Sequence, residues 1–142
     1  MSRSAENSTE STLPSSPSTI LIAEDSESNA MLFSLYFKGT KYILDFAQNG
    51  KQAVDKFKST TYDLVLMDIL MPVMDGWQAT EAIRSYETEK GLSPSPIVAV
   101  TANTFEEDRQ KSLNAGCTDF LPKPVRKAAL LDCVARLTHR SP

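Results

Sequence analysis

The stretch Leu64-Val65-Leu66-Met67-Asp68 decides the fold of this 142-residue chain. Four apolar residues in a row, ended by an acid, are typical of a strand that is buried on both faces, as the strands of parallel sheets are. The runs Ile20-Leu21-Ile22-Ala23 and Ile97-Val98-Ala99-Val100 repeat this pattern. The sequence therefore predicts a sheet in which these three runs form fully buried parallel strands.

Two weaker strand candidates indicate where the sheet ends. The segments Tyr42 to Ala47 and Cys117 to Leu121 are interrupted, the first by Asp45 and the second by Thr118-Asp119. Interrupted runs suit edge strands, because one side of an edge meets solvent. Four helix-length segments separate the five strands and a fifth follows the last. This alternation predicts a doubly wound α/β fold of five strand–helix units with right-handed crossovers.

Helix starts are marked by cap residues that stand three positions before a Glu or Gln, the spacing of a capping box. The pairs are Asn49 with Gln52, Asp75 with Gln78, and Thr104 with Glu107. Glycines then stand where helices should stop, because a glycine adopts the left-handed conformation of a helix C-terminus at little cost. We expect Gly39, Gly91 and Gly116 to have this role.

Composition limits the classes of function. Hydrophobic residues make up 41% and charged residues 23%, as in an ordinary globular domain. The net charge of −3 argues against a nucleic-acid partner, and no apolar run is long enough to insert in a membrane. The only histidine, His139, leaves no basis for a histidine-rich zinc site. Two cysteines form no disulfide framework, so we expect a cytoplasmic protein.

The chain divides into two parts by composition. Residues 1–18 are rich in Ser, Thr and Pro, and they contain too few apolar side chains to offset the entropy of ordering. We interpret them as a disordered tail or linker, and residues 19–139 as one folded domain. No room follows the last helix for a DNA-binding domain, so we expect output through protein contacts.

Polar groups follow the predicted strands at their carboxyl ends, where ligands bind in such sheets. They are Glu24-Asp25, Asp68, Thr101 and Lys123, from four different strands. Three neighbouring carboxylates repel one another, so they need a compensating cation or one of them must stay protonated. Mg²⁺ together with Lys123 balances three negative charges, and Mg²⁺ prefers oxygen ligands. A charged network around Lys123 that holds no ligand is the open alternative.

These residues occur in motifs that together resemble the receiver domain of two-component response regulators. The motifs, in order, are Glu24-Asp25, Asp68 followed by Met71-Pro72 and Met74-Asp75-Gly76, Thr101-Ala102, and Lys123-Pro124. The resemblance extends from Thr19 to Leu137. It implies a flavodoxin/CheY-like (βα)5 fold with strand order 2-1-3-4-5, in which the two interrupted strands are the edges.

The resemblance implies a phosphoacceptor and a metal site. Asp68 matches the aspartate that takes a phosphoryl group from a phosphohistidine. Asp25 and Asp68 match ligands of Mg²⁺, the backbone carbonyl of Leu70 matches a third, and Glu24 is expected to act through a water molecule. Phosphoryl transfer needs positioning and neutralisation of charge, which a cation and a lysine supply.

The resemblance also assigns residues that respond to phosphorylation. The Thr101 hydroxyl, the backbone amide of Ala102 and the Lys123 ammonium are expected to contact the phosphoryl group, and Thr101 and Phe120 match switch residues. For Phe120, an ordinary packing role is the alternative. The Lys123–Pro124 bond matches a cis-proline position.

The implied function is that of a switch rather than an enzyme, although the domain assists its own phosphorylation and dephosphorylation. The implied partners are a histidine kinase or a histidine-phosphotransfer domain, and a downstream protein target. Segments such as Ala82-Ile83-Arg84 favour a receiver of the hybrid-kinase type, while a stand-alone regulator stays open. A docking module that is never phosphorylated is one alternative. An aspartyl-phosphate phosphatase is another, although Asp68-Ile69-Leu70 lacks the second aspartate of that motif.

Overall fold

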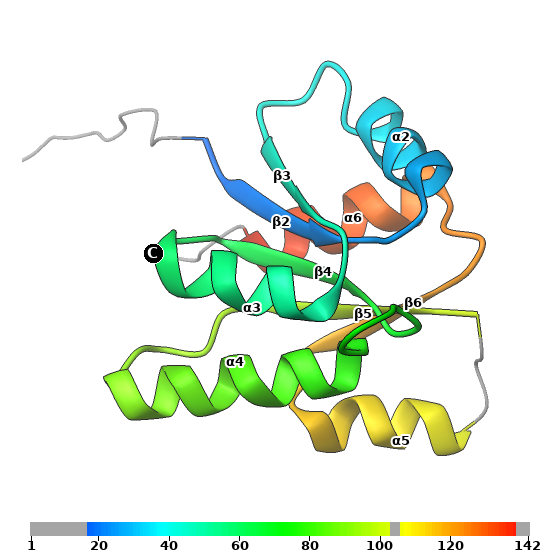
Figure 1. The fold of residues 1–142 in the computed structure, drawn as a ribbon. Coiled ribbons are helices and arrows are strands. Elements are labelled where there is room, and N and C mark those ends of the chain that lie inside the picture. The colour runs from blue at the N-terminus through cyan, green and yellow to red at the C-terminus, as the bar shows by residue number, and fades with distance from the viewer. Residues whose placement is uncertain (1–16, 103–105, 139–142) are drawn as a thin grey trace, which may run out of the picture.

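The computed structural model describes residues 17–102 and 106–138. Its centre is a sheet of five parallel strands in the spatial order β3-β2-β4-β5-β6, which is 2-1-3-4-5 in chain order (Figure 1). The strands are β2 (Thr19–Ala23), β3 (Ile43–Ala47), β4 (Leu64–Asp68), β5 (Ile97–Thr101) and β6 (Asp119–Pro122). The predicted fold and strand order are confirmed.

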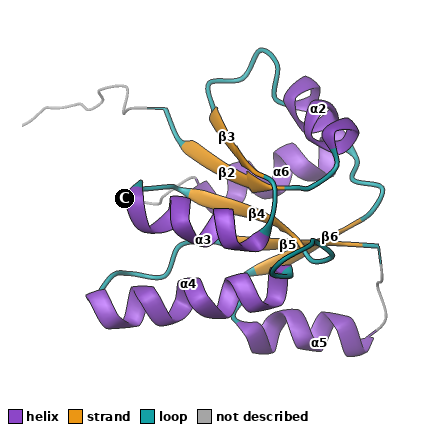
Figure 2. Cartoon of the chain, viewed as in Figure 1, coloured by secondary structure: helices purple, strands orange, loops and turns teal. Residues whose placement is uncertain are grey.

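In the described part of the chain, five helices cover the two faces of the sheet. Helices α3, α4 and α5 lie on one face, and α2 and α6 lie on the other (Figures 1 and 2). The helices are α2 (Glu27–Tyr36), α3 (Gly50–Ser59), α4 (Gly76–Lys90), α5 (Glu106–Ala115) and α6 (Lys127–Thr138). Each of the first four helices is the crossover between two successive parallel strands, and α6 follows the last strand.

Helices bury both faces of the sheet, and alternate residues of each central strand point to opposite faces. On β2, Leu21 and Ala23 pack in the core cluster under α3 and α4. Ile20 and Ile22 pack in the second cluster, with residues of α2 and α6. Every residue of β4 and β5 is buried. The unbroken apolar runs of the sequence follow from this burial on both faces.

The interrupted strands are the edges, as their sequences predict. On β3, Ile43 is exposed, and Asp45 accepts hydrogen bonds from Lys56 Nζ at 2.9 Å and from the Tyr62 hydroxyl at 2.5 Å. The polar residue that breaks the apolar run thus ties the edge to α3 and to the loop before β4. On the opposite edge, β6 starts at Asp119, two residues later than the predicted segment.

Cap residues begin the helices as predicted. Asp75 and Gln78 form a complete capping box at the start of α4. Asn49 caps α3, but the Gln52 side chain accepts the amide of Gln48 rather than that of Asn49. Gly91, at φ 69°, ends α4.

Three sequence interpretations fall outside the described residues. These concern the tail up to residue 16, the Thr104 cap and His139.

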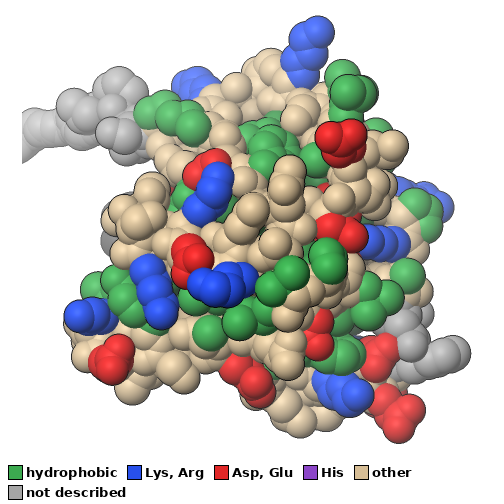
Figure 3. Space-filling model, in the orientation of Figure 1, with side chains coloured by type: hydrophobic (Ala, Val, Ile, Leu, Met, Phe, Trp, Pro, Cys, Tyr) green, Lys and Arg blue, Asp and Glu red, His purple; other side chains and the backbone are tan. Residues whose placement is uncertain are grey.

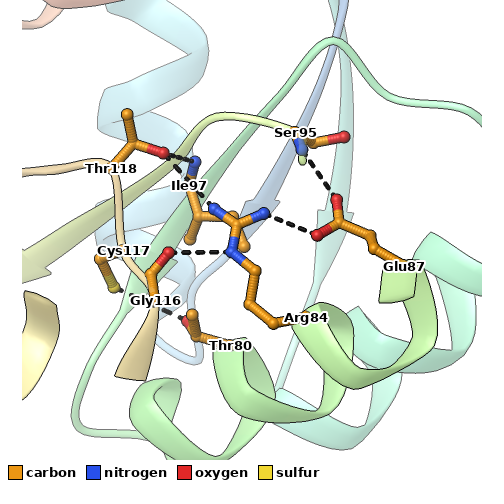
Figure 4. A network of polar contacts seen from close by, with 8 residues as sticks. All are labelled: Thr80, Arg84, Glu87, Ser95, Ile97, Gly116, Cys117 and Thr118. Atoms are coloured by element: carbon orange, nitrogen blue, oxygen red, sulfur yellow. Dashed lines mark hydrogen bonds and ion pairs between the residues drawn. The ribbon is translucent and has the colours of Figure 1, made fainter. Parts of the chain in front are cut away.

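At the amino ends of β5 and β6, a network of polar contacts centres on Arg84 of α4 (Figure 4). Its guanidinium donates to Glu87 Oε1 at 2.7 Å and to the Gly116 carbonyl at 2.9 Å. Glu87, itself buried, accepts the amide of Ser95 at 2.7 Å. The network joins α4 to the loops before β5 and β6, at the end of the sheet opposite to the carboxyl ends of the strands.

Candidate functional site

Three carboxylates meet at the carboxyl ends of β2 and β4. Glu24 and Asp25 directly follow β2, and Asp68 is the last residue of β4. The two strands are paired in register, with Ala23 opposite Met67, so the residues that follow come to the same edge. One oxygen from each carboxylate lies within 4.8 Å of the others. The structure therefore brings together the acids that the sequence placed at two strand ends.

Lys123, which directly follows β6, completes this charged cluster. Its ammonium lies 3.0 Å from Asp68 Oδ1 and 3.9 Å from Glu24 Oε1. The position is fixed by the backbone, because the Lys123 amide donates to the Thr101 carbonyl at 2.8 Å. The bond between Lys123 and Pro124 is cis, in agreement with the resemblance. The Lys123 cation thus faces two buried carboxylates.

Glu24 is the least satisfied member of the cluster. Its Oε2 accepts the amide of Ser26 at 3.1 Å, but among the described residues its buried Oε1 has no hydrogen-bond partner. Burial raises the pKa of the Glu24 carboxyl, and the Asp68 charge adds to the rise, while the Ser26 amide and Lys123 act against it. A buried oxygen without a donor carries an energetic penalty unless a cation or water satisfies it.

The donor set suits a divalent cation that prefers oxygen. Within the part of the chain that the structure describes, the acidic cluster offers carboxylate oxygens and no His or Cys, which favours Mg²⁺ or Ca²⁺ over metals that prefer His or Cys. Asp25 is exposed, so the cluster opens to solvent on that side and leaves room for the water ligands that Mg²⁺ retains. The unsatisfied Glu24 Oε1 is the structural observation that supports such an ion.

The remaining predicted residues surround the cluster. Thr101 ends β5, is buried and pairs in register with Pro122, whereas Ala102 and Leu70 are exposed. Phe120 of β6 is partly buried and packs against the core cluster under α3 and α4. The Arg109 guanidinium of α5 lies 5.1 Å from the centre of the Phe120 ring, which connects the ring with a helix that follows β5.

Two glycines hold the loop after Asp68, and the sequence analysis did not assign them this role. A Cβ on Gly76 would lie 2.4 Å from the Asp68 carbonyl oxygen, and one on Gly50 would lie 2.2 Å from that of Met74. Without side chains, Gly76 donates its amide to the Ile69 carbonyl at 2.8 Å and Gly50 donates to Met74 at 3.0 Å. The sequence signal for this role was a glycine directly after the cap residue, at the first position of both α3 and α4.

The fold defines a doubly wound α/β domain, in which ligands bind at the carboxyl ends of the strands, and here that edge carries the acidic cluster and Lys123. The family model described as "Response regulator receiver domain" matches residues 20–135, most of the chain. The chain therefore belongs to the response regulator receiver domain family. It is a receiver domain of two-component and phosphorelay systems.

Curated relatives include much larger proteins. The chain is 43% identical over 120 residues to "Hybrid signal transduction histidine kinase B" of Dictyostelium discoideum, a match that covers 79% of this chain and 6% of the relative. The matches to the next two relatives cover 16% and 15% of their length. The chain thus spans a small part of the curated relatives that it matches.

Two solved receiver domains show the same fold. The receiver domain of Ssk1 from Saccharomyces cerevisiae, crystallised with the histidine phosphotransfer signaling protein Ypd1, aligns with a TM-score of 0.83 and 32% identity over 87% of this chain and 90% of that chain. The receiver domain of sensor histidine kinase PA1611 from Pseudomonas aeruginosa aligns with a TM-score of 0.77 and 34% identity, over 87% and 99%. The latter structure is described with a magnesium ion coordinated in its active site cleft.

None of the helices that the structure describes combines the length and the apolar character needed to cross a bilayer. On the face seen in Figure 3, acidic and basic side chains are interspersed rather than gathered by sign.

Proposed function

We propose that Asp68 is the phosphoacceptor of this receiver domain. The observation that carries the proposal is the contact between Asp68 Oδ1 and Lys123 Nζ at 3.0 Å, beside the carboxylates of Glu24 and Asp25. In the transfer, an oxygen of the Asp68 carboxylate forms a bond to phosphorus. The bond between phosphorus and the donor imidazole nitrogen breaks, and its electron pair stays on that nitrogen. The product is an aspartyl phosphate.

The proposed metal is Mg²⁺, held by Asp25, Asp68 and the Leu70 carbonyl, with Glu24 contributing through a water molecule. When bound, the ion neutralises charge on the phosphoryl oxygens. The acid cluster and the unsatisfied Glu24 Oε1 support this assignment. So does the magnesium ion in the related PA1611 receiver domain.

The residues around Asp68 have separate roles in this proposal. Lys123 holds the Asp68 carboxylate before transfer and pairs with the added phosphoryl charge afterwards. Thr101 donates its hydroxyl, and Ala102 its amide, to phosphoryl oxygens. The shift of Thr101 toward the phosphoryl group frees space for Phe120, which is already partly buried next to α5. A local change of charge thereby alters the surface formed by α5 and β6.

The proposed donor is a phosphohistidine on a histidine kinase or on a histidine-phosphotransfer domain. The Ssk1 receiver domain, crystallised with Ypd1, supports a donor of the second kind. We propose a downstream protein target, no nucleic-acid partner, and a cytoplasmic location. The similarity to histidine kinases favours a receiver of the hybrid-kinase type.

Two further features complete the proposal. Residues 1–18 act as a linker or tail to a receiver domain at 19–139, consistent with a family match that begins at residue 20. The domain is a switch that assists its own phosphorylation rather than an enzyme with a separate substrate.

The test uses phosphoramidate, a small phosphodonor, in the presence of Mg²⁺. We expect the intact mass of the native chain to rise by one phosphoryl group, and the Asp68→Asn variant to show no increase. An Asp63→Asn variant is the control. Asp63 is a partly buried aspartate that lies away from the acid cluster, and its carboxylate accepts a hydrogen bond from the Thr19 amide. Equal labelling of Asp68→Asn and the native chain would overturn the assignment.

A further inference from the structure

Tyr36 joins the end of helix α2 to the loop that carries Lys123. It is the last residue of α2, and its hydroxyl donates a hydrogen bond to the Val125 carbonyl at 3.0 Å. The two residues lie 89 positions apart in the sequence, and Figure 1 shows the loop after β6 passing beside α2. The tyrosine ring packs against the second core cluster, to which Val125 also belongs. Packing and a directed contact therefore hold the loop to the helix.

The hydroxyl of Tyr36 adds something that packing alone does not need. A phenylalanine ring would fill the same space, whereas the hydroxyl of a partly buried tyrosine requires a hydrogen-bond partner. Its partner here is a main-chain atom of a distant loop. Val125 is 8% exposed, so its carbonyl has little access to water if the tyrosine hydroxyl is removed. The contact thus fixes the path of the main chain at this position.

Lys123 lies between two anchors of that main chain. On one side its own amide donates to the Thr101 carbonyl at 2.8 Å, which ties the loop to β5. On the other side, two residues later, the Val125 carbonyl accepts the Tyr36 hydroxyl. Pro124 stands between them and has no N–H to donate. The long lysine side chain reaches Asp68 with less loss of entropy when its main chain is already in place.

Helix α2 is tied to the acid cluster at its other end as well. Ser26 caps the start of α2, and its amide donates to Glu24 Oε2 at 3.1 Å. The other oxygen of Glu24 lies 3.9 Å from the Lys123 ammonium. One helix therefore holds a carboxylate of the cluster at its first turn and the loop of the neutralising cation at its last residue.

We propose that Tyr36 is a positioning residue of the phosphorylation site, which holds the loop at residues 123–125 so that the Lys123 ammonium stays on Asp68. The inference rests on the proposed function of Asp68. Tyr36 acts through the main chain of the loop and not by contact with the phosphoryl group. Without its hydroxyl, the loop is held at one side only, and the ammonium spends more time in solvent. Lys123 then neutralises the acid cluster less completely.

The first test measures how reactive the Lys123 ammonium is in the full chain, with EDTA present. Brief treatment with acetic anhydride acylates free lysine amines, and peptide mass spectrometry gives the extent at each lysine. We expect Tyr36→Phe to raise the rate of acylation at Lys123 at least about threefold, as for the loss of one neutral hydrogen bond. Lys56 contacts Asp45 on the opposite edge strand and is the internal reference, whose rate should not change.

The second test measures the affinity for Mg²⁺ by calorimetric titration. A less engaged Lys123 leaves the cluster more negative, so Tyr36→Phe should bind Mg²⁺ about twofold more tightly or better. A general loosening of the fold would instead weaken binding. In the Lys123→Met background, Tyr36→Phe should have no further effect, because the residue through which it acts is gone.

Tyr42→Phe is the matched control. Tyr42 packs against the same core cluster, and its hydroxyl lies 3.5 Å from Thr138 Oγ1, at the last residue of α6 and away from the loop of Lys123. Removing this hydroxyl should leave both the acylation of Lys123 and the affinity for Mg²⁺ at their native values.

Equal acylation of Lys123 in the native chain and in Tyr36→Phe would overturn the positioning role. So would an affinity for Mg²⁺ that Tyr36→Phe leaves unchanged, or changes equally in the native and Lys123→Met backgrounds. A native chain that binds no Mg²⁺, or that phosphoramidate does not label, would instead contradict the proposed function. In that case the acylation of Lys123 still decides whether Tyr36 positions it.

Discussion

The Lys123 ammonium lies 3.0 Å from Asp68 Oδ1, although Asp68 ends the third strand of the sheet in chain order and Lys123 follows the fifth. Both side chains are largely buried, at 27% and 4% exposed. Lys123 therefore neutralises one carboxylate of the cluster in the protein alone, while Glu24 Oε1 remains 3.9 Å away. This arrangement leaves the cluster with a net negative charge before any metal binds.

Replacing Lys123 by Met should change stability and metal affinity in opposite directions. Without metal, we expect Lys123→Met to lower the free energy of unfolding by about 2 kcal/mol, because Asp68 loses its cation in a buried place. Mg²⁺ should bind more tightly, because the cluster is then more negative. Urea unfolding with EDTA and with Mg²⁺ measures both effects.

The control is Lys51→Met, which breaks an exposed pair with Asp55 and should change stability by less than about 1 kcal/mol. Unaltered stability of Lys123→Met in EDTA would argue against the neutralising role of Lys123.

The close approach of Gly76 to the backbone of Asp68 makes a second prediction. We expect Gly76→Ala to lower the free energy of unfolding by about 3 kcal/mol or more, because its Cβ would meet backbone atoms of Asp68 and Ile69 that cannot move aside easily. Gly39→Ala is the matched control, since no atom lies within 4 Å of its Cβ and only its φ of 84° is unfavourable. That variant should lose about 1 kcal/mol. Similar losses in both would refute the steric argument.

Asp45 on the edge strand β3 makes the free energy of unfolding depend on pH. The hydrogen bond from the Tyr62 hydroxyl, aided by Lys56, lowers the pKa of the Asp45 carboxyl. Because the folded pKa lies below the unfolded one, this contribution is present above the unfolded pKa and is lost as pH falls through the folded value. Tyr62→Phe should therefore destabilise the protein more at about pH 7 than at about pH 3.

Chemical unfolding of the native chain and of Tyr62→Phe across this range measures the difference. Tyr86→Phe is the control, since its hydroxyl donates to the Lys58 carbonyl and not to a carboxylate. An effect of Tyr62→Phe that is the same at both ends of the range would contradict the role of Asp45.

The Arg84 network predicts a large effect far from the cluster. Arg84→Gln leaves the buried Glu87 without its cation, so we expect a loss of about 3 kcal/mol in the free energy of unfolding. Arg136→Gln removes an exposed pair with Asp119 and should lose less than about 1 kcal/mol. Thermal or urea unfolding of both variants compares them directly. Equal losses would show that burial does not govern how much these two ion pairs contribute to the free energy of unfolding.

Much of the fold could be predicted from local patterns. Runs such as Leu64 to Met67 reflect burial on both faces, and Asp45 marks an edge because a polar residue there reaches outward to Lys56. The candidate site also follows from the sequence, because parallel strands bring their carboxyl ends together. Asp68 and Lys123 could be placed near each other on that ground.

Other features depend on contacts that no local pattern specifies. Arg84 reaches the carbonyl of Gly116, and Gly50 donates to Met74, only after distant segments pack together. The positive φ of Val73 has no sequence signal, since valine disfavours that conformation and the closed loop imposes it. The unsatisfied oxygen of Glu24 likewise appears only once its surroundings are known.

The proposed transfer forms an acyl phosphate on Asp68. The most direct measurement is borohydride reduction of the chain after treatment with phosphoramidate and Mg²⁺, followed by peptide mass spectrometry. Borohydride reduces the acyl phosphate to an alcohol and releases phosphate, so an aspartate that carried the phosphoryl group becomes homoserine. We predict homoserine at position 68 and unmodified aspartate at position 25. Homoserine at another position, or phosphate that remains on the chain after reduction, would contradict the account.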